Sequence, residues 1–222
     1  MSEQAASPTP VSVFDTDEPD FAARMAEAEG ISTKREAIVR AALTMFATHG
    51  YQGTSLRRLA DSVGIEAGSL YNHITSKNDL LSDMVVFATH EVLTGVRDRL
   101  ETAPAEPADR LRVAITSHIQ FHCVQREQVI VLDREFTVLS GENAEKVLAA
   151  RAAYENVFRE IVAEGIEGGA FRRHDAALST KAILRLGPGT ATWFHKNGPE
   201  TAQQIGAFYA ELFVRGLAVD AY

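Results

Sequence analysis

Apolar residues recur along most of the chain at the three- and four-residue spacing of an amphipathic helix. In the stretch 32–50, for example, Ile38, Ala42 and Phe46 share one face. A Ser or Thr can cap the start of this helix, and Gly50 can end it. Period-two alternation of β-branched residues, which would indicate strands, is nearly absent. The pattern therefore predicts an all-α fold.

Two short helices follow the first one closely. One begins at a Thr-Ser cap and ends at Gly64, and the next occupies 65–74, which together describe a helix-turn-helix. After Ser76 an apolar face continues for about six turns, so this helix is expected to be the longest of the chain. Further helices are predicted at 107–124, 127–139, 142–164, 175–196 and 200–218.

The helix pattern divides the chain into three parts. Residues 1–31 carry prolines and acids without a sustained apolar period, and we expect a flexible acidic tail with at most a short helix near 21–29. Residues 32–78 form the helix-turn-helix unit. Residues 79–222 form a larger helical bundle, which we expect to bind an effector and to dimerise.

Composition and charge narrow the class of protein. The 222 residues are 45% hydrophobic and include one cysteine, and no apolar run is long enough to span a membrane, so we expect a reducing cytoplasm. The net charge of −8 argues against a protein that coats nucleic acid through bulk attraction. However, the block 32–80 holds six basic and four acidic residues and is the net-positive part of the chain.

The second helix of a helix-turn-helix lies in the DNA major groove, and the composition here suits that role. Short polar groups and one flat ring occupy this helix and can reach base edges or phosphates. The residues that we expect to contact DNA are Thr54, Ser55, Arg57, Ala67, Gly68, Ser69, Tyr71, Asn72, His73 and Lys77. The alternative is ordinary helix packing, which uses the same geometry.

The stretch 50–81 resembles the DNA-binding signature of the tetracycline-repressor-like (TetR) transcriptional regulators. A Gly-aromatic pair, a Thr-Ser cap, Leu-Ala on the bracing helix and a Gly-Ser-Leu-Tyr run carry the resemblance. The departure is Ile74, where the family usually has Phe. The resemblance implies homodimers that read two half-sites. It also implies phosphate contacts at Thr54, Ser55, Tyr71, His73 and Lys77 and base contacts at Ala67, Gly68, Ser69 and Asn72.

The end of the chain, 183–219, is similar to that of family members that respond to acyl-coenzyme A thioesters of fatty acid or sterol breakdown. His195 and Lys196 depart from the Arg-Pro usual after the aromatic pair. The run Gly187-Pro188-Gly189 should break or kink its helix, because proline lacks an N–H and clashes with the preceding turn. A kink there would open room for a ligand between helices.

Aromatic, basic and histidine side chains of the bundle are candidates for the effector pocket, although each is individually more common in a core or on a surface. His118 and His122, beside Cys123, have a metal-ligand spacing, but no further ligands lie nearby in sequence, so no metal is predicted. A hydrogen bond from one of them to an effector carbonyl is the better hypothesis. The candidates are His118, Phe121, His122, Arg126, Phe136, Phe158, Arg185, Trp193 and Phe194, with Leu132 and Arg134 as further possibilities.

The last two helices suit a homodimer interface, and their apolar stripe consists of Ile205, Phe208, Tyr209, Leu212, Phe213 and Leu217. The alternative is that this stripe packs inside its own subunit. The sequence lacks a Gly-rich phosphate loop and the motifs of common hydrolases, so we predict no enzyme and no cofactor. The function predicted is a repressor that binds a palindromic operator and is released by a small hydrophobic effector, an acyl-coenzyme A thioester of lipid or sterol catabolism. Hydrophobic drugs or free fatty acids are the alternative effectors, and a helical protein-interaction module without DNA binding is the distant alternative.

Overall fold

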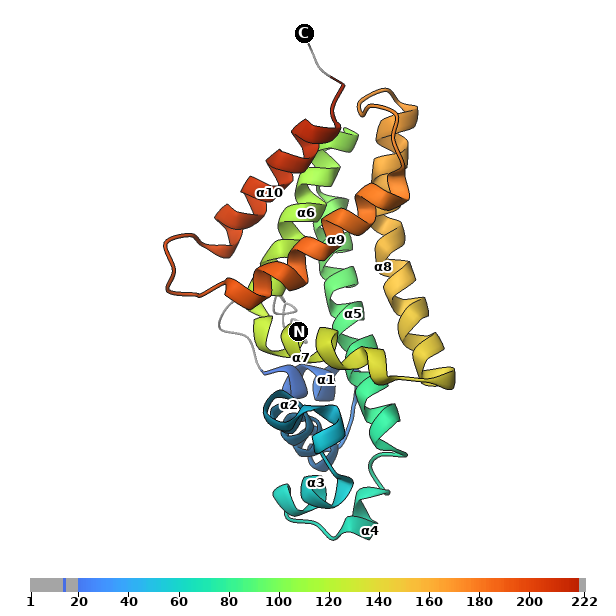
Figure 1. Ribbon diagram of the computed structural model, residues 1–222, viewed down its shortest axis with the longest axis vertical. Coiled ribbons are helices and arrows are strands. Elements are labelled where there is room, and N and C mark those ends of the chain that lie inside the picture. Colours follow the sequence, from blue (N-terminus) through green and yellow to red (C-terminus); the bar gives the residue numbers. More distant parts are fainter. Residues whose placement is uncertain (1–13, 15–19, 220–222) are drawn as a thin grey trace, which may run out of the picture.

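The computed structural model describes residues 14 and 20–219, and its regular elements are helices apart from one isolated β-bridge between Phe171 and Ala218. The all-α prediction is confirmed. Figure 1 shows an elongated molecule with a small helical unit at one end and a larger bundle at the other. The elements are α1 (Phe21–Glu29), α2 (Thr33–Gly53), α3 (Leu56–Ser62), α4 (Ala67–Leu70), α5 (Lys77–Glu101), α6 (Pro107–Val124), α7 (Arg126–Glu135), η1 (Phe136–Val138), α8 (Gly141–Glu167), α9 (Ala176–Trp193) and α10 (Ala202–Leu217).

Helix α5 connects the two ends of the molecule. Its first half packs into a core with α1 to α4, where Leu80 and Leu81 are buried, and its second half packs into the core of the bundle, where Val92 and Val96 are buried. Helix α5 therefore runs without interruption from one core into the other (Figure 1). The expectation that α5 is the longest helix is wrong, since α8 has 27 residues against 25.

The short helix considered possible near 21–29 is present and packed. Asp20 caps α1 by accepting from the backbone N–H of Ala23, and Phe21 and Met25 are buried against α2 and α5. The Phe21 ring meets the Phe87 ring edge-on at 5.4 Å between centroids. The predicted tail is therefore shorter than 1–31, and its first part, 1–13 and 15–19, lies outside the described residues.

The sequence predicts a break or a kink at Gly187-Pro188-Gly189, and a break does not occur. Helix α9 continues from Ala176 to Trp193 with Pro188 inside it. Packing on both sides holds the helix, because Ile183 and Ala191, on either side of the proline, are both buried in the core of the bundle. No helix in the described part of the chain is both long and apolar enough to cross a membrane.

Candidate functional site

The segment predicted to read DNA lies at the tip of the small unit (Figure 1). Leu70 is fully buried and anchors it, whereas Tyr71 is 60% exposed. The α-helix itself ends at Leu70, and Tyr71 to His73 continue as a turn in which the N–H of His73 donates to the carbonyl of Leu70 at 2.9 Å. Ala67, Gly68 and Asn72 are exposed, and Ser69 and His73 are half-buried.

Of the four flanking residues predicted to contact phosphates, two are available. Ser55, the N-cap of α3, and Arg57, in its first turn, are both exposed. Thr54 is fully buried and its hydroxyl donates to the Gly50 carbonyl at 2.9 Å, so this structure does not present its side chain to a phosphate. The reason is that Thr54 ends α2 and faces the interior.

Lys77 is also held inside the unit. Its ammonium donates to the carbonyls of Tyr51 at 2.8 Å and Thr54 at 2.7 Å, and lies 4.1 Å from the centre of the Tyr51 ring. Partial burial lowers the pKa of Lys77. This lysine therefore ties the end of α2 to the start of α5.

Arg35 positions the turn and was missed by the sequence reasoning. Its guanidinium donates to the His73 carbonyl at 2.7 Å and to the Asp83 carboxylate at 2.6 Å. It thereby joins the exposed turn to α5. Nothing in the sequence signals this role, because the three residues are far apart along the chain.

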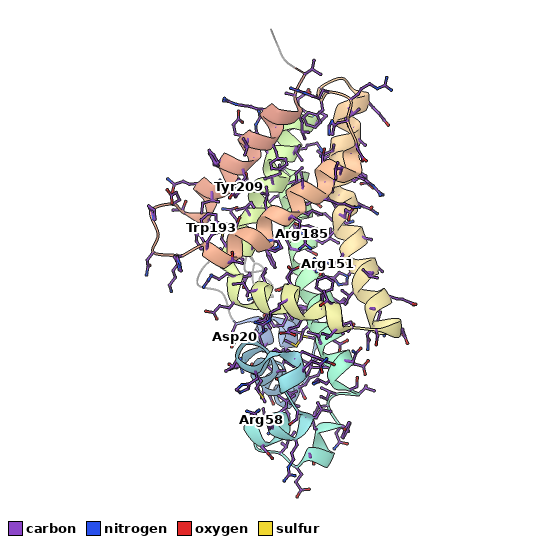
Figure 2. All side chains as sticks on the ribbon, viewed as in Figure 1. Asp20, Arg58, Arg151, Arg185, Trp193 and Tyr209 are labelled. Atoms are coloured by element: carbon purple, nitrogen blue, oxygen red, sulfur yellow. The ribbon has the colours of Figure 1, made fainter. Side chains whose placement is uncertain are left out.

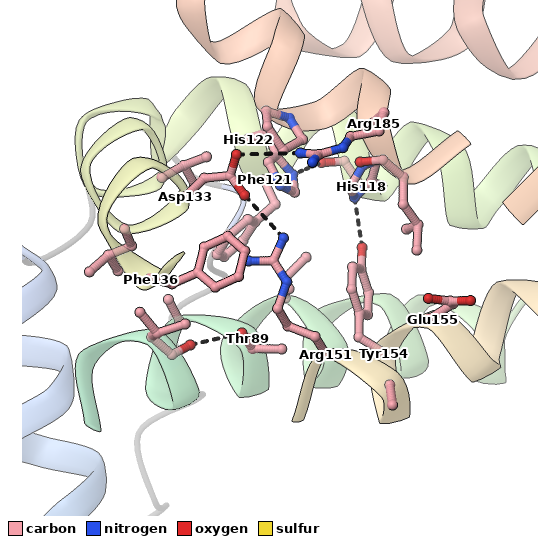
Figure 3. Close-up of a pocket in the computed structure, with 18 of the residues that line it drawn as sticks. Thr89, His118, Phe121, His122, Asp133, Phe136, Arg151, Tyr154, Glu155 and Arg185 are labelled. Carbon is pink, nitrogen blue, oxygen red and sulfur yellow. Dashed lines mark hydrogen bonds and ion pairs between the residues drawn. The ribbon is translucent and has the colours of Figure 1, made fainter. Parts of the chain in front are cut away.

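A cavity of about 690 Å³ lies within the bundle, between α5, α6, α7, η1, α8 and α9. Figure 3 shows polar side chains of its lining, among them His118 of α6, Asp133 of α7, Arg151 of α8 and Arg185 of α9, pointing toward one another. Its walls are mainly apolar. The lining residues are Val85, Ala88, Thr89, Val92, His118, Phe121, His122, Val129, Leu132, Asp133, Phe136, Leu148, Arg151, Ala152, Tyr154, Glu155, Lys181, Leu184, Arg185 and Pro188.

Five of the nine residues predicted to contact the effector line this cavity: His118, Phe121, His122, Phe136 and Arg185. The other four do not, for reasons of packing.

Phe158 and Phe194 are buried in the core, and Arg126 donates to the carbonyl of Ala191 at 3.1 Å. Trp193 is 49% exposed at the end of α9, apart from Arg151 and Arg185 in Figure 2.

The sequence reasoning missed several polar lining residues, among them Asp133, Arg151, Tyr154 and Lys181. A signal existed, because the lining positions of α8 and α9 follow helical spacing. Residues 148, 151, 152 and 155 form one stripe, and 181, 184, 185 and 188 form another. Which stripe of each helix bounds a cavity is not visible in the sequence.

His118, His122 and Tyr154 form a buried polar cluster in the cavity wall. The Nδ1 atom of His118 lies 2.8 Å from the Tyr154 hydroxyl, and its Nε2 atom lies 3.2 Å from the carbonyl of Leu184. The Nδ1 atom of His122 lies 2.7 Å from the His118 carbonyl. The two imidazole centres are 4.2 Å apart.

Burial keeps this cluster uncharged. Desolvation, and to a lesser extent the neighbouring His122, hold the pKa of His118 well below its ordinary value. Desolvation lowers the pKa of His122 to about 4 and raises the pKa of Tyr154 well above its ordinary value. At neutral pH the cluster therefore offers neutral hydrogen-bonding groups, with no cation among them.

The motif Gly187-Pro188 builds the side of the cluster that faces α9. Pro188 has no N–H, so the carbonyl of Leu184 lacks its in-helix donor, and His118 lies in hydrogen-bonding distance of that carbonyl instead. A Cβ at Gly187 would lie 2.5 Å from the His118 Nε2 and 2.7 Å from the His122 ring. Only glycine allows α9 to approach the two rings this closely.

Charged groups gather on another part of the wall. The Asp133 carboxylate lies 3.0 Å from the Arg151 guanidinium and 3.6 Å from that of Arg185, and Arg151 stacks 4.1 Å from the centre of the Phe136 ring (Figure 3). The Arg185 side chain is 72% exposed. With Lys181 the lining holds three cations, against two carboxylates.

A metal site is not formed by the described residues, which contain no group of three His, Cys, Asp or Glu side chains able to hold an ion. Burial raises the pKa of the Cys123 thiol to about 12. A thiol with this pKa is a poor metal ligand at neutral pH.

The apolar stripe of α10 divides between core and surface. Ile205 is buried, and Tyr209, Phe213 and Leu217 pack partly against the core of the bundle. Phe208 and Leu212 are 67% and 56% exposed. The alternative of packing within the subunit therefore holds for part of the stripe, and Phe208 and Leu212 lie outside that packing.

A helix-turn-helix unit joined by one continuous helix to a bundle that encloses a cavity defines a class, the ligand-binding transcriptional regulators. Within that class, residues 38–84 match the family model described as bacterial regulatory proteins, tetR family, and residues 104–217 match that of the tetracyclin repressor-like C-terminal domain. The second match spans half of the chain. The protein belongs to the TetR family.

Individual relatives share most of the chain. The HTH-type transcriptional repressor KstR2 of Mycobacterium tuberculosis is 26% identical over 86% of this chain and 96% of its own length. A TetR-family regulatory protein from Rhodococcus RHA1 superimposes with a TM-score of 0.76 at 28% identity, over 85% of this chain and 100% of that one. The fold is also that of FadR from Bacillus subtilis in complex with stearoyl-CoA, with a TM-score of 0.66 at 21% identity over 82% and 98% of the two chains.

Proposed function

We propose that this protein is a transcriptional repressor that binds operator DNA as a homodimer and is released by an acyl-coenzyme A thioester of lipid or sterol catabolism. One observation carries the proposal. A cavity of about 690 Å³ with apolar walls and cationic side chains is bounded by α5, the same helix that enters the core of the helix-turn-helix unit.

The chemistry of the lining supports a thioester. The apolar walls suit an acyl or sterol-derived moiety, and the exposed Lys181 and Arg185 are suited to phosphate groups at the surface. A free fatty acid would use one of these cations, and a neutral drug would use neither. FadR, which shares the fold, holds stearoyl-CoA in its structure.

The connection between the cavity and the DNA-reading turn suggests how release works. Val85, Ala88, Thr89 and Val92 of α5 line the cavity, and the first turns of α5 pack with the buried Leu70 of α4 in one core. An effector that prefers a shifted α5 changes the separation of the two turns in the dimer. A coupling of about 1 to 3 kcal/mol weakens operator binding by roughly 5- to 150-fold.

Replacement of Tyr71 tests the DNA-reading turn. We expect Tyr71→Ala to abolish specific operator binding without a change in melting temperature, because the side chain is 60% exposed and makes little packing contact. Tyr71→Phe separates the contribution of the hydroxyl from that of the ring. Operator affinity measured by fluorescence anisotropy that stays the same in Tyr71→Ala would contradict the assignment of the turn.

Thermal shift and operator release, measured with acyl-coenzyme A thioesters, free fatty acids and hydrophobic drugs, test the effector. We expect thioesters to raise the melting temperature and to release the operator. The variant Lys181→Ala should weaken thioester binding, whereas Lys196→Ala, at another exposed lysine outside the cavity, should leave it unchanged. Stabilisation by drugs alone would rule out the thioester.

A further inference from the structure

The buried polar cluster of His118, His122 and Tyr154 is unexpected in a cavity meant for plain hydrocarbon. A polar atom left facing an apolar ligand loses its water without gaining a partner, which costs free energy. The hydrogen bonds within the cluster determine what partner it is able to accept.

The donor and acceptor roles of His118 follow from its partners. A carbonyl oxygen only accepts, so the Nε2 atom that faces the Leu184 carbonyl carries the proton. In a neutral imidazole the other nitrogen is then an acceptor. The Tyr154 hydroxyl consequently donates to Nδ1 of His118, and its own hydrogen is used.

The same reasoning applies to His122. Its Nδ1 atom faces the carbonyl of His118 and must carry the proton, so Nε2 is left with a lone pair. His122 lines the cavity, and within the described part of the chain its Nε2 makes no hydrogen bond. Both available atoms of the cluster, the His122 Nε2 and the Tyr154 hydroxyl oxygen, are therefore acceptors.

We propose that this cluster is a subsite for a hydroxyl group on the apolar part of the effector, which donates its hydrogen to Nε2 of His122. The subsite rests on the proposed function in one respect, that the effector occupies this cavity. The carbonyl partner expected from the sequence does not fit, because a ketone finds no donor in the cluster. A hydroxyl matches the fixed acceptors, and a methyl group leaves them unpaired.

Matched ligands test the subsite. The probes are hexanoyl-, decanoyl- and tetradecanoyl-coenzyme A, each in three forms that end in a methyl group, a hydroxyl group or a methyl ketone. The series of lengths allows the terminal group to reach the cluster. By isothermal titration we expect, at the best length, a Kd about ten-fold lower for the hydroxyl form than for either of the others.

Variants locate the preference in the cluster. His122→Phe keeps a ring but removes the acceptor, and should make the Kd values of the three forms equal. His195→Phe makes the same replacement at an exposed histidine outside the cavity and should keep the preference for the hydroxyl form.

The outcomes separate this inference from the proposed function. Thioesters that bind with equal Kd in all three forms, or with the ketone form tightest, overturn the subsite and leave the proposed function standing. A hydroxyl preference that persists in His122→Phe also overturns it. Failure of every thioester to bind overturns both.

Discussion

At the scale of single residues, Gly187 and Pro188 have complementary effects on the cavity. The glycine allows the rings of His118 and His122 to approach α9, and the proline leaves the Leu184 carbonyl for His118 to bind. A motif that in isolation disrupts a helix here determines which atoms of the cluster are acceptors.

A methyl group at position 187 tests whether α9 lies as close to the two histidine rings as described. Gly187→Ala should lower the free energy of unfolding by about 1 to 3 kcal/mol, because its Cβ overlaps the buried histidine rings. Gly189→Ala, two residues away and with nothing within 4 Å of its Cβ, should be neutral or stabilising by up to about 1 kcal/mol. Denaturant unfolding of the two variants compares them, and equal stability would contradict the packing described.

The buried histidines also predict a pH dependence. Folding depresses the pKa of His122 to about 4 from an ordinary 6.5, so its contribution to stability is present above pH 6.5 and is lost as the pH falls towards 4. That contribution amounts to roughly 3 kcal/mol. His122→Gln should therefore lose less stability than the wild type on acidification over this range. Parallel pH profiles of unfolding for the two proteins would contradict the neutral, buried state.

At the scale of elements, the docking of α1 depends on a buried ion pair. The Arg24 guanidinium lies 2.6 Å from the Glu91 carboxylate of α5, and the two side chains are 10% and 8% exposed. Desolvation raises the pKa of Glu91, and the hydrogen bond from Arg24 opposes that shift. The pair therefore fixes the position of α1 more than it adds stability.

Removal of one partner of this ion pair should lower the stability of the protein more than removal of both. Arg24→Met leaves a buried carboxylate unpaired and should cost about 3 to 5 kcal/mol at neutral pH. The cost should shrink at lower pH, because a Glu91 with a raised pKa becomes protonated. The double variant Arg24→Met with Glu91→Leu should regain most of the loss in thermal unfolding. A double variant no more stable than Arg24→Met would contradict this account.

At the scale of the whole molecule, α7 provides a second connection between cavity and DNA unit. Leu132 and Asp133 line the cavity, and the Arg134 guanidinium donates to the Phe46 carbonyl of α2 at 2.6 Å. Movement of α7 on effector binding would act on α2 directly, in parallel with α5.

Arg134→Ala tests this second connection. We expect operator binding without effector to persist, and the effector-induced loss of operator affinity to shrink several-fold, because one of the two paths is cut. Arg159→Ala, at an exposed arginine of α8, is the control. An unchanged loss of affinity in Arg134→Ala, measured by operator titration with and without thioester, would assign the coupling to α5 alone.

The last prediction at this scale is that the exposed part of α10 forms the dimer interface. Leu212→Arg places a charge on the exposed part of α10 and should yield a monomer with weak operator binding. Ala149→Arg, on an exposed face of α8, should remain a dimer. Light scattering coupled to size-exclusion chromatography gives the molar mass of each variant. A dimeric Leu212→Arg would show that the interface lies elsewhere on the molecule.

Local patterns in the sequence were sufficient to predict where most of the helices lie. The bounds predicted for 107–124 agree with α6, because Pro107 starts the helix and its apolar period is regular. The possibility of a break in α9 and the relative length of α8 were misjudged: Pro188 lies inside α9, and α8 continues past Gly165, which packs closely against the Phe171 ring. His118, Phe121 and His122 were found because aromatic and histidine side chains stand out in a predicted bundle.

The sequence by itself determined the helical class and the segment that is similar to a DNA-reading motif, because periodicity, caps and turn residues act between near neighbours. The tertiary structure alone decided that Thr54 and Lys77 face inward, that Asp133, Arg151 and Tyr154 meet His118 and His122 around one cavity, and which nitrogen of each histidine is an acceptor. These features depend on which faces of separate helices meet. They also depend on the carbonyl of Leu184, which Pro188 leaves without an in-helix donor and which lies far from the histidines along the chain.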